Sequence, residues 1–239
     1  MLQNLAMTSS NPFKGYQFDK HIIMQTVYWY CRYSLSYRDI EELMNERCVE
    51  IDHSSMQRWV KAFIPLIEEQ ARRRKKPVNG SWRIDETYIK VKREWCYLYR
   101  AVDKEGNTID FLLCKNRDTE AAKRFFEKAI QSNGVPLKIN IDKSGANTAA
   151  LEEINQERKA EGEEPIEVRR IKYLNNQVEQ DHRFIKRLTR PMLGFKSFIS
   201  AGITLIGIEI VRMIKKCQLK TSILGQKPID QFRELFASC

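Results

Sequence analysis

Apolar residues in the first 70 positions recur at helical spacing in three separate stretches, which predicts three short helices. The first extends from Lys20 to Tyr33. The second begins after Ser36, with Asp39 three residues later as its capping partner. The third begins near Ser54, with Gln57 as capping partner, and its apolar face carries Met56, Trp59, Val60 and Phe63. Three short helices in this order are typical of a helix-turn-helix.

The segment Ala71 to Gly80, "ARRRKKPVNG", has five consecutive cations followed by a proline and an Asn-Gly pair. Such a segment is typical of a linker between domains. We therefore predict an N-terminal arm over 1–18, a helix-turn-helix domain over 19–70 and a basic linker over 71–80.

Beyond the linker the apolar period changes from helical to extended. Three strands are predicted in "SWRIDETYIKV", "EWCYLYRAVD" and "NTIDFLLCK", followed by a helix that Asp118 caps and Gly134 ends. A strand "LKINID", a helix over 148–159, a strand "IEVRRI" and a helix over 175–188 complete the order βββαβαβα. This order predicts an RNase H-like α/β domain over 81–190, a mixed sheet flanked by helices. Residues 191–239 are predicted as a C-terminal helical segment that covers this domain or forms a dimer surface.

Aromatic side chains in the predicted strands are expected to lie in the core rather than to stack on bases. This expectation covers Trp82, Trp95, Tyr97 and Tyr99.

Charge indicates a polyanionic partner. The 239 residues include 41 Lys and Arg against 31 Asp and Glu, which gives a formal net charge of +10. Nucleic acid is the leading candidate. The six cysteines show no recurring spacing, so we expect neither a zinc site nor disulfides, and a reducing cytoplasm. The longest apolar run, Phe198 to Val211, is shorter than the roughly 20 residues of a membrane-spanning helix, so no membrane segment is expected.

Three acids stand out as candidate catalytic residues. Asp85 lies inside a predicted strand, where an unpaired carboxylate costs several kcal/mol. Asp142 ends another strand, and Glu179 lies in the last predicted helix. Because strand side chains alternate, we expect Asp85 and Glu86 to face opposite ways, so that at most one serves a given site and Glu86 is structural.

The helix that carries Glu179 has two distinct faces. Arg183, Lys186 and Arg190 share the Glu179 face, while Val178, Phe184, Ile185 and Leu188 form the opposite, core-facing side. Asp181 falls on the apolar side and is interpreted as a buried polar anchor. His182 has two possible roles, contact with DNA and packing in the core.

These residues and their surroundings resemble a known family. The segments "NPFKGYQF", "YRDIEELM", "DHSSMQRWV", "RIDETYIKV", "WCYLYRAVD" and "YLNNQVEQDHRFIKR" are similar to those of DDE transposases of the insertion sequence six family. The resemblance runs from about Asn11 to at least Glu209. The sequence departs from the family at two points. The 36 residues between Asp142 and Glu179 slightly exceed the family spacing, and "DKSGAN", which begins at Asp142, lacks the Ala-Pro that more commonly follows the Asp-Lys pair.

The resemblance implies a bacterial, nucleoid-associated enzyme that cuts the ends of its own element and joins them to target DNA, forming cointegrates. Asp85, Asp142 and Glu179 are then both the catalytic residues and the metal ligands. Their oxygen-only chemistry favours two Mg²⁺ ions, with Mn²⁺ as a substitute.

The implied DNA contacts fall in two groups. Ser55, Gln57, Arg58 and Lys61 would read the terminal inverted repeats, and Arg183, Lys186 and Arg190 would hold phosphates. Because two ends must be brought together, at least a homodimer is expected. A DNA-binding regulator with a non-catalytic scaffold and a hydrolytic nuclease are the alternatives.

Overall fold

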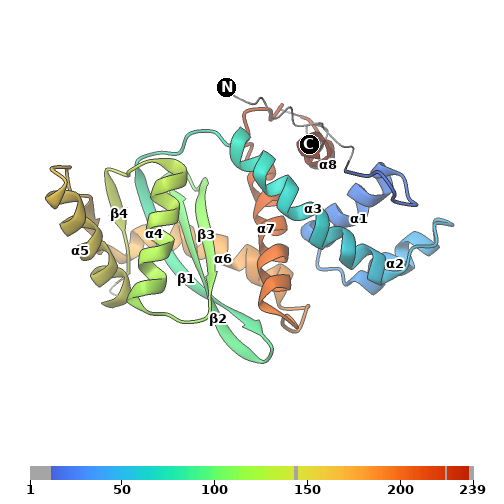
Figure 1. Cartoon of the computed structure of the whole chain (residues 1–239), viewed down its shortest axis with the longest axis horizontal. Coiled ribbons are helices and arrows are strands. Elements are labelled where there is room, and N and C mark those ends of the chain that lie inside the picture. Colours follow the sequence, from blue (N-terminus) through green and yellow to red (C-terminus); the bar gives the residue numbers. More distant parts are fainter. Residues whose placement is uncertain (1–11, 143–144, 224, 237–239) are drawn as a thin grey trace, which may run out of the picture. The chain divides into compact units, whose positions relative to one another are not determined.

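The computed structural model describes residues 12–142, 145–223 and 225–236 (Figure 1). They form two compact units. One contains the chain up to Lys75 together with the residues from Ile206 onward, and the other contains Lys76–Leu205. Within the described residues, no helix is both long and apolar enough to cross a membrane.

The first unit is helical and is built from both ends of the chain. It contains α1 (Lys20–Arg32), α2 (Tyr37–Asn45), α3 (His53–Arg74), the second half of α7 (Phe198–Lys215) and α8 (Pro228–Phe236). The rings of Phe63 in α3 and Phe236 in α8 lie 5.1 Å apart in the core. Residues 191–239, treated above as one segment, are therefore divided between the two units.

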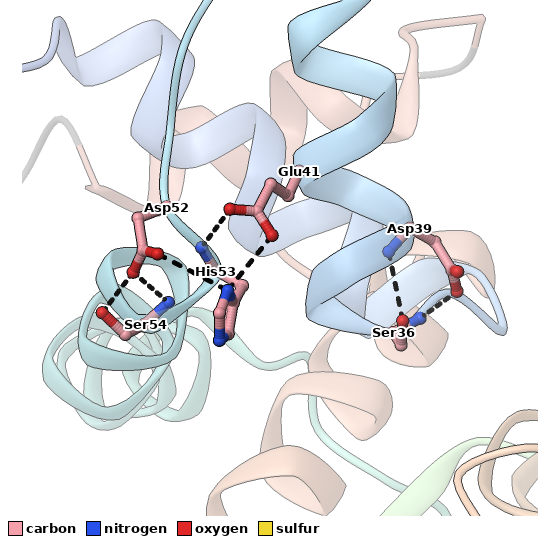
Figure 2. A network of polar contacts seen from close by, with 6 residues as sticks. All are labelled: Ser36, Asp39, Glu41, Asp52, His53 and Ser54. Carbon is pink, nitrogen blue, oxygen red and sulfur yellow. Dashed lines mark hydrogen bonds and ion pairs between the residues drawn. The ribbon is translucent and has the colours of Figure 1, made fainter.

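Capping side chains fix where α2 and α3 begin. Figure 2 shows the predicted capping box of α2, in which the Asp39 backbone N–H donates to Ser36 Oγ at 3.1 Å and the Ser36 N–H donates to Asp39 at 2.6 Å. α3 begins at His53, one residue from the predicted start, but the predicted capping pair of Ser54 and Gln57 was wrong, because Asp52 caps the helix by accepting from the Ser54 N–H at 2.8 Å. Asp52 can do so because its backbone is extended while its carboxylate turns back to the first helical N–H groups.

The turn between α2 and α3 is tied together by one histidine. The Nδ1 atom of His53 lies 3.1 Å from Glu41 in α2 and 3.5 Å from Asp52 (Figure 2). These contacts join the second helix to the start of the third.

α3 continues through the first part of the predicted linker. Two arginines of α3 each pair with the glutamate one helical turn before them: Arg72 with Glu68 at 2.8 Å and Arg73 with Glu69 at 2.5 Å. Such i,i+4 pairs stabilise a helix. Ala71 is fully buried, so the last turn of α3 also packs.

The second unit is built around a five-stranded sheet in the order β3-β2-β1-β4-β5. β1 (Ser81–Val91), β2 (Glu94–Asp103) and β3 (Thr108–Cys114) form an antiparallel meander, while β4 (Lys138–Asn140) and β5 (Glu167–Arg169) add in parallel. With α4 (Thr119–Asn133), α5 (Gly145–Ala160), η1 (Lys172–Asn175) and α6 (Asn176–Thr189), the predicted order βββαβαβα is observed. The RNase H-like fold class is confirmed.

Helices cover both faces of this sheet. Trp82 and Ile84 of β1 pack with Phe125 and Phe126 of α4 and Leu151 of α5 in one buried cluster. Figure 1 shows α4 in front of the sheet and α6 behind it. β1 therefore lies between two helical layers, where a carboxylate is shielded from water.

Candidate active site

The candidate site lies where β4 ends beside the central strand. β4 pairs with β1 only from Ser81 to Arg83, so no strand pairs with this edge of β1 from Ile84 until Phe195 bridges it at Val91. Asp85 and Glu86 lie on this open edge. Asp142 follows two residues after the end of β4. The ends of strands next to helical crossovers are where functional side chains gather in such sheets.

Asp85, Glu86 and Asp142 converge at this point. Each offers a carboxylate oxygen, and these oxygens all lie within 4.8 Å of one another. The structure thus brings together two of the three predicted acids. Lys143 and Ser144, in the "DKSGAN" segment, lie outside the described residues.

The expectation that Asp85 and Glu86 cannot share a site was wrong. Side chains still alternate here, because β1 keeps an unbroken register with β2. Alternation sets only the direction in which each side chain starts, and one carboxylate oxygen of each residue still lies within 4.8 Å of the others. The buried positions of β1 also change phase at this point, from Trp82 and Ile84 to Ile89 and Val91. That change in which alternate positions are apolar could be read in the sequence, although the pairing of β1 with β2 stays regular through Asp85 and Glu86.

Glu86 is held from two directions. Asn147 of α5 donates to Glu86 Oε1 at 2.7 Å, and Arg117, before α4, donates to Oε2 at 3.2 Å. The same Arg117 nitrogen lies 3.4 Å from Asp142 Oδ2. Arg117 therefore links Glu86 to Asp142. Sequence reasoning missed both partners of Glu86, since Arg117 belongs to no motif and Asn147, the last residue of "DKSGAN", was given no role.

The acids change one another's ionisation. Burial raises the pKa of Asp85 to about 7, with further contributions from the charges of Glu86, Asp142 and Glu179. Burial also raises the pKa of Glu86, against the opposing effects of Arg117 and Asn147. Crowded carboxylates of this kind gain most from a bound cation.

Glu179 lies in the first turn of α6 and is exposed. Its charge acts on Asp85, but it is not one of the three acids whose oxygens lie within 4.8 Å of one another. Further along α6, Arg183 and Arg190 are exposed and Lys186 is half-buried. Helical spacing places all four on one face.

A buried polar group supports Asp85 from α6. His182 Nδ1 lies 3.5 Å from Asp85 Oδ2. The neighbouring Asp181 pairs with Arg100 of β2 at 3.4 Å, and Arg100 is the direct cross-strand partner of Asp85. Asp181 and Arg100 are both buried, which confirms Asp181 as a buried polar anchor.

The predicted base-reading residues lie in α3 of the helical unit. Gln57, Arg58 and Lys61 are exposed, whereas Ser55 is half-buried and accepts a hydrogen bond from Arg58 at 2.9 Å. Three of the four side chains are thus accessible.

Comparison with known proteins gives a family. A DDE domain family model, DDE_Tnp_IS240, matches residues 79–218. The transposase for insertion sequence-like element IS431mec of Staphylococcus aureus strain Mu50 is 40% identical over 230 residues, covering 95% of this chain and all of its own length. The transposase for insertion sequence element IS257 in transposon Tn4003, also from Staphylococcus aureus, matches with the same identity and coverage.

Solved structures with a related core include two retroviral integrase domains. The HTLV-2 integrase catalytic core domain in complex with magnesium is 21% identical, with a TM-score of 0.44, over 56% of this chain and 86% of its own. The catalytic core domain of BIV integrase is 19% identical, with a TM-score of 0.44, over 67% of this chain and 97% of its own.

The family model covers the whole acidic site, and the relatives match along almost the full length of both chains. The chain therefore belongs to the DDE transposases of the insertion sequence six family.

Proposed function

We propose that this chain binds the terminal inverted repeats of its own insertion sequence, cuts DNA at those ends and transfers the freed strands to target DNA. The observation that carries this proposal is the meeting of Asp85 and Asp142 at the open edge of β1, within the electrostatic reach of Glu179. The relatives are transposases of insertion sequences and match this chain from end to end.

The residues at this point fit a divalent metal. The oxygens that lie together are carboxylate oxygens, which are the ligands that Mg²⁺ and Mn²⁺ prefer. We propose that Asp85, Asp142 and Glu179 hold two Mg²⁺ ions, with Mn²⁺ as a substitute. Bound metal would activate the attacking oxygen and stabilise the leaving one.

The protein's own part in the reaction is to hold and to orient. Arg183, Lys186 and Arg190 extend from Glu179 in one direction along one face of α6, so they would bind successive phosphates on one side of the reacting one. The attacking oxygen would come first from water, which frees a 3′-hydroxyl, and then from that hydroxyl, which attacks a target strand. Joining donor to target in this way yields cointegrates.

The helical residues 19–70 would supply end recognition. Gln57, Arg58 and Lys61 are exposed on one side of α3, and glutamine and arginine suit adenine and guanine edges in the major groove. Ser55 Oγ accepts a hydrogen bond from Arg58, and its own O–H would donate to DNA. Arg73 and Lys76 would add affinity that depends on salt rather than sequence.

Two element ends must be held at once, so the working form would be at least a homodimer. Its place would be the bacterial cytoplasm, at the nucleoid, where the DNA substrate lies. The catalytic part would comprise residues 81–190.

One assay separates this proposal from its alternatives. Purified protein is mixed with labelled DNA from the end of the element, unlabelled target DNA and Mg²⁺. The proposal predicts end-to-target joined products. Cut DNA without joining would indicate a hydrolytic nuclease, and retarded but intact DNA would indicate a regulator without catalysis.

A further inference from the structure

A second feature of the sheet unit is a cavity of about 600 Å³ beside the hairpin of β1 and β2. Residues from β1, β2 and α6 and from the loop after α6 line it. Those that matter here are Tyr88, Lys90, Trp95, Lys186, Arg190 and Phe195. Its size is in the range of pockets that hold one small organic group.

The loop after α6 is fixed against β1 and forms a wall of the cavity. The Phe195 N–H donates to the Lys90 carbonyl at 2.8 Å, and the Lys92 N–H donates to the Phe195 carbonyl at 2.7 Å. Gly194 has φ +94°, and a Cβ there would lie 3.1 Å from the Lys90 carbonyl oxygen. This close approach requires glycine, so the wall is a built part of the fold.

Two aromatic rings stand in solvent at the mouth of the cavity. Trp95 is 59% exposed and Tyr88 is 50% exposed, and their rings meet edge to face at 6.2 Å. The expectation that Trp95 is a core residue was wrong, although it was right for Trp82 and Tyr99. Trp95 is the second residue of β2, next to the hairpin turn and opposite Lys90. The turn residues beside it are exposed as well, so the core does not extend to this end of the sheet.

The charge around these rings is positive. Lys90, Lys186 and Arg190 line the cavity, and none of the described residues that line it is acidic. Lys90 Nζ lies 5.8 Å from the Trp95 ring centre. Exposed aromatic faces among cations suit a flat aromatic group attached to an anion, which is the chemistry of a nucleotide.

The cavity lies close to the acids along two elements. Tyr88 is two residues from Glu86 on the same face of β1, a rise of about 7 Å. Lys186 is seven residues from Glu179 on the same face of α6, a rise of about 10 Å. Since bases along one DNA strand are spaced about 3.4 Å apart, these distances correspond to roughly two or three nucleotides.

We propose that this cavity receives one unpaired base of the DNA, two or three nucleotides from the phosphate at the acids, and that Trp95 stacks on it. This inference rests on the proposed function, which supplies the DNA. A paired base has both faces covered by its neighbours, whereas a base outside the duplex offers a free face to Trp95 and its phosphate to Lys186 and Arg190.

The test measures binding without catalysis. Duplexes from the element's end carry a single unpaired thymine at one of the first five positions and are compared with the fully paired duplex in EDTA. We expect one or two positions to bind about tenfold more tightly. The same duplexes should quench tryptophan fluorescence, because Trp95 is 59% exposed, whereas Trp59 and Trp82 are buried and Trp29 is half-buried.

Two substitutions at one position separate stacking from folding. Trp95→Ala is expected to lose the tenfold preference, whereas Trp95→Phe keeps it within about threefold but loses the quenching. Leu137→Ala is the matched control, since Leu137 is 77% exposed in the same unit and lies just before β4, outside the cavity lining. Thermal melting checks that all three variants fold.

Equal binding of all duplexes by the wild-type protein, or an unchanged preference in folded Trp95→Ala, would overturn the inference. A separate strand-joining assay in Mg²⁺ keeps the two proposals apart. Strand joining without any base preference would support the proposed function and overturn the inference about the cavity. A base preference without strand joining would support base binding in the cavity and overturn the proposed strand transfer.

Discussion

His182 faces Asp85 with its Nδ1 atom 3.5 Å from Oδ2 of the carboxylate. Burial, with the nearby charges of Arg100 and Lys186, lowers the pKa of His182 to about 3, so the imidazole is neutral near pH 7. A neutral imidazole has one N–H, and a neighbouring carboxylate favours that hydrogen on the nitrogen that faces it. The contact therefore orients Asp85 without forming an ion pair.

Removal of this contact should weaken metal binding. We expect His182→Ala to raise the Mg²⁺ concentration needed for half-maximal strand transfer by about 10- to 100-fold, as for other residues that orient metal ligands. His182→Asn, which keeps an N–H donor, should lose less. His21→Ala is the control, because His21 is exposed in the helical unit. An unchanged Mg²⁺ dependence in His182→Ala would remove the positioning role.

Glu86 should act through Arg117 rather than as an essential ligand. Both of its carboxylate oxygens are already engaged, one by Asn147 and one by Arg117. Glu86→Gln keeps an acceptor for Asn147 but loses the ion pair, so we expect about a tenfold lower rate of strand transfer at saturating Mg²⁺. Single-turnover rates measure this, with the exposed Glu120→Gln as control. Complete loss of activity in Glu86→Gln would make it an indispensable ligand instead.

The raised pKa of Asp85 predicts how stability depends on pH in the metal-free protein. Between its ordinary value and about 7, the folded protein binds more protons at Asp85 than the unfolded chain does. Unfolding free energy therefore falls as pH rises through this window. Asp85→Asn removes the penalty, so its melting temperature in EDTA should exceed that of wild type by about 5 °C at pH 8 and by little at pH 4. A difference that does not grow with pH would contradict the raised pKa.

Local signals predicted much of this fold, and long-range contacts account for what they missed. The capping box of Ser36 and Asp39 was readable because it depends on residues three apart. The cations after Ala71 were read as a linker, although Arg72 and Arg73 each follow a glutamate by four residues, a local signal of a continuing helix that was missed.

At the candidate site, Asp85 and Asp142 could be identified from the motif and from their places in the strands. Glu86 was rejected by the rule of alternation, which gives the direction in which a side chain leaves the strand but not where the carboxylate at its end lies. Trp95 was assigned to the core because β-propensity does not say which part of a strand is covered. The C-terminal helix was left with two interpretations, since its apolar pattern does not identify a partner.

Two glycines in α7 test where that helix packs. A Cβ at Gly207 would collide with Cys31 Sγ in α1 and would lie 3.0 Å from Ile64 Cδ1 in α3. A Cβ at Gly202 would meet nothing within 4 Å. We expect Gly207→Ala to destabilise the protein by about 1–3 kcal/mol through overpacking, and Gly202→Ala to stabilise it by up to about 1 kcal/mol through helix propensity. Denaturant unfolding measures both, and a neutral Gly207→Ala would contradict the packing against α1 and α3.

The central claim is that Asp85, Asp142 and Glu179 together form the strand-transfer centre. The most direct measurement is the yield of joined product from Asp85→Asn, Asp142→Asn and Glu179→Gln in Mg²⁺, with binding to element-end DNA measured on the same preparations. We expect at least a roughly thousandfold loss of joined product in each variant, because each substitution removes a charge that would hold the metal, with end binding unchanged. A variant that binds the ends and still joins them at the wild-type rate would contradict it.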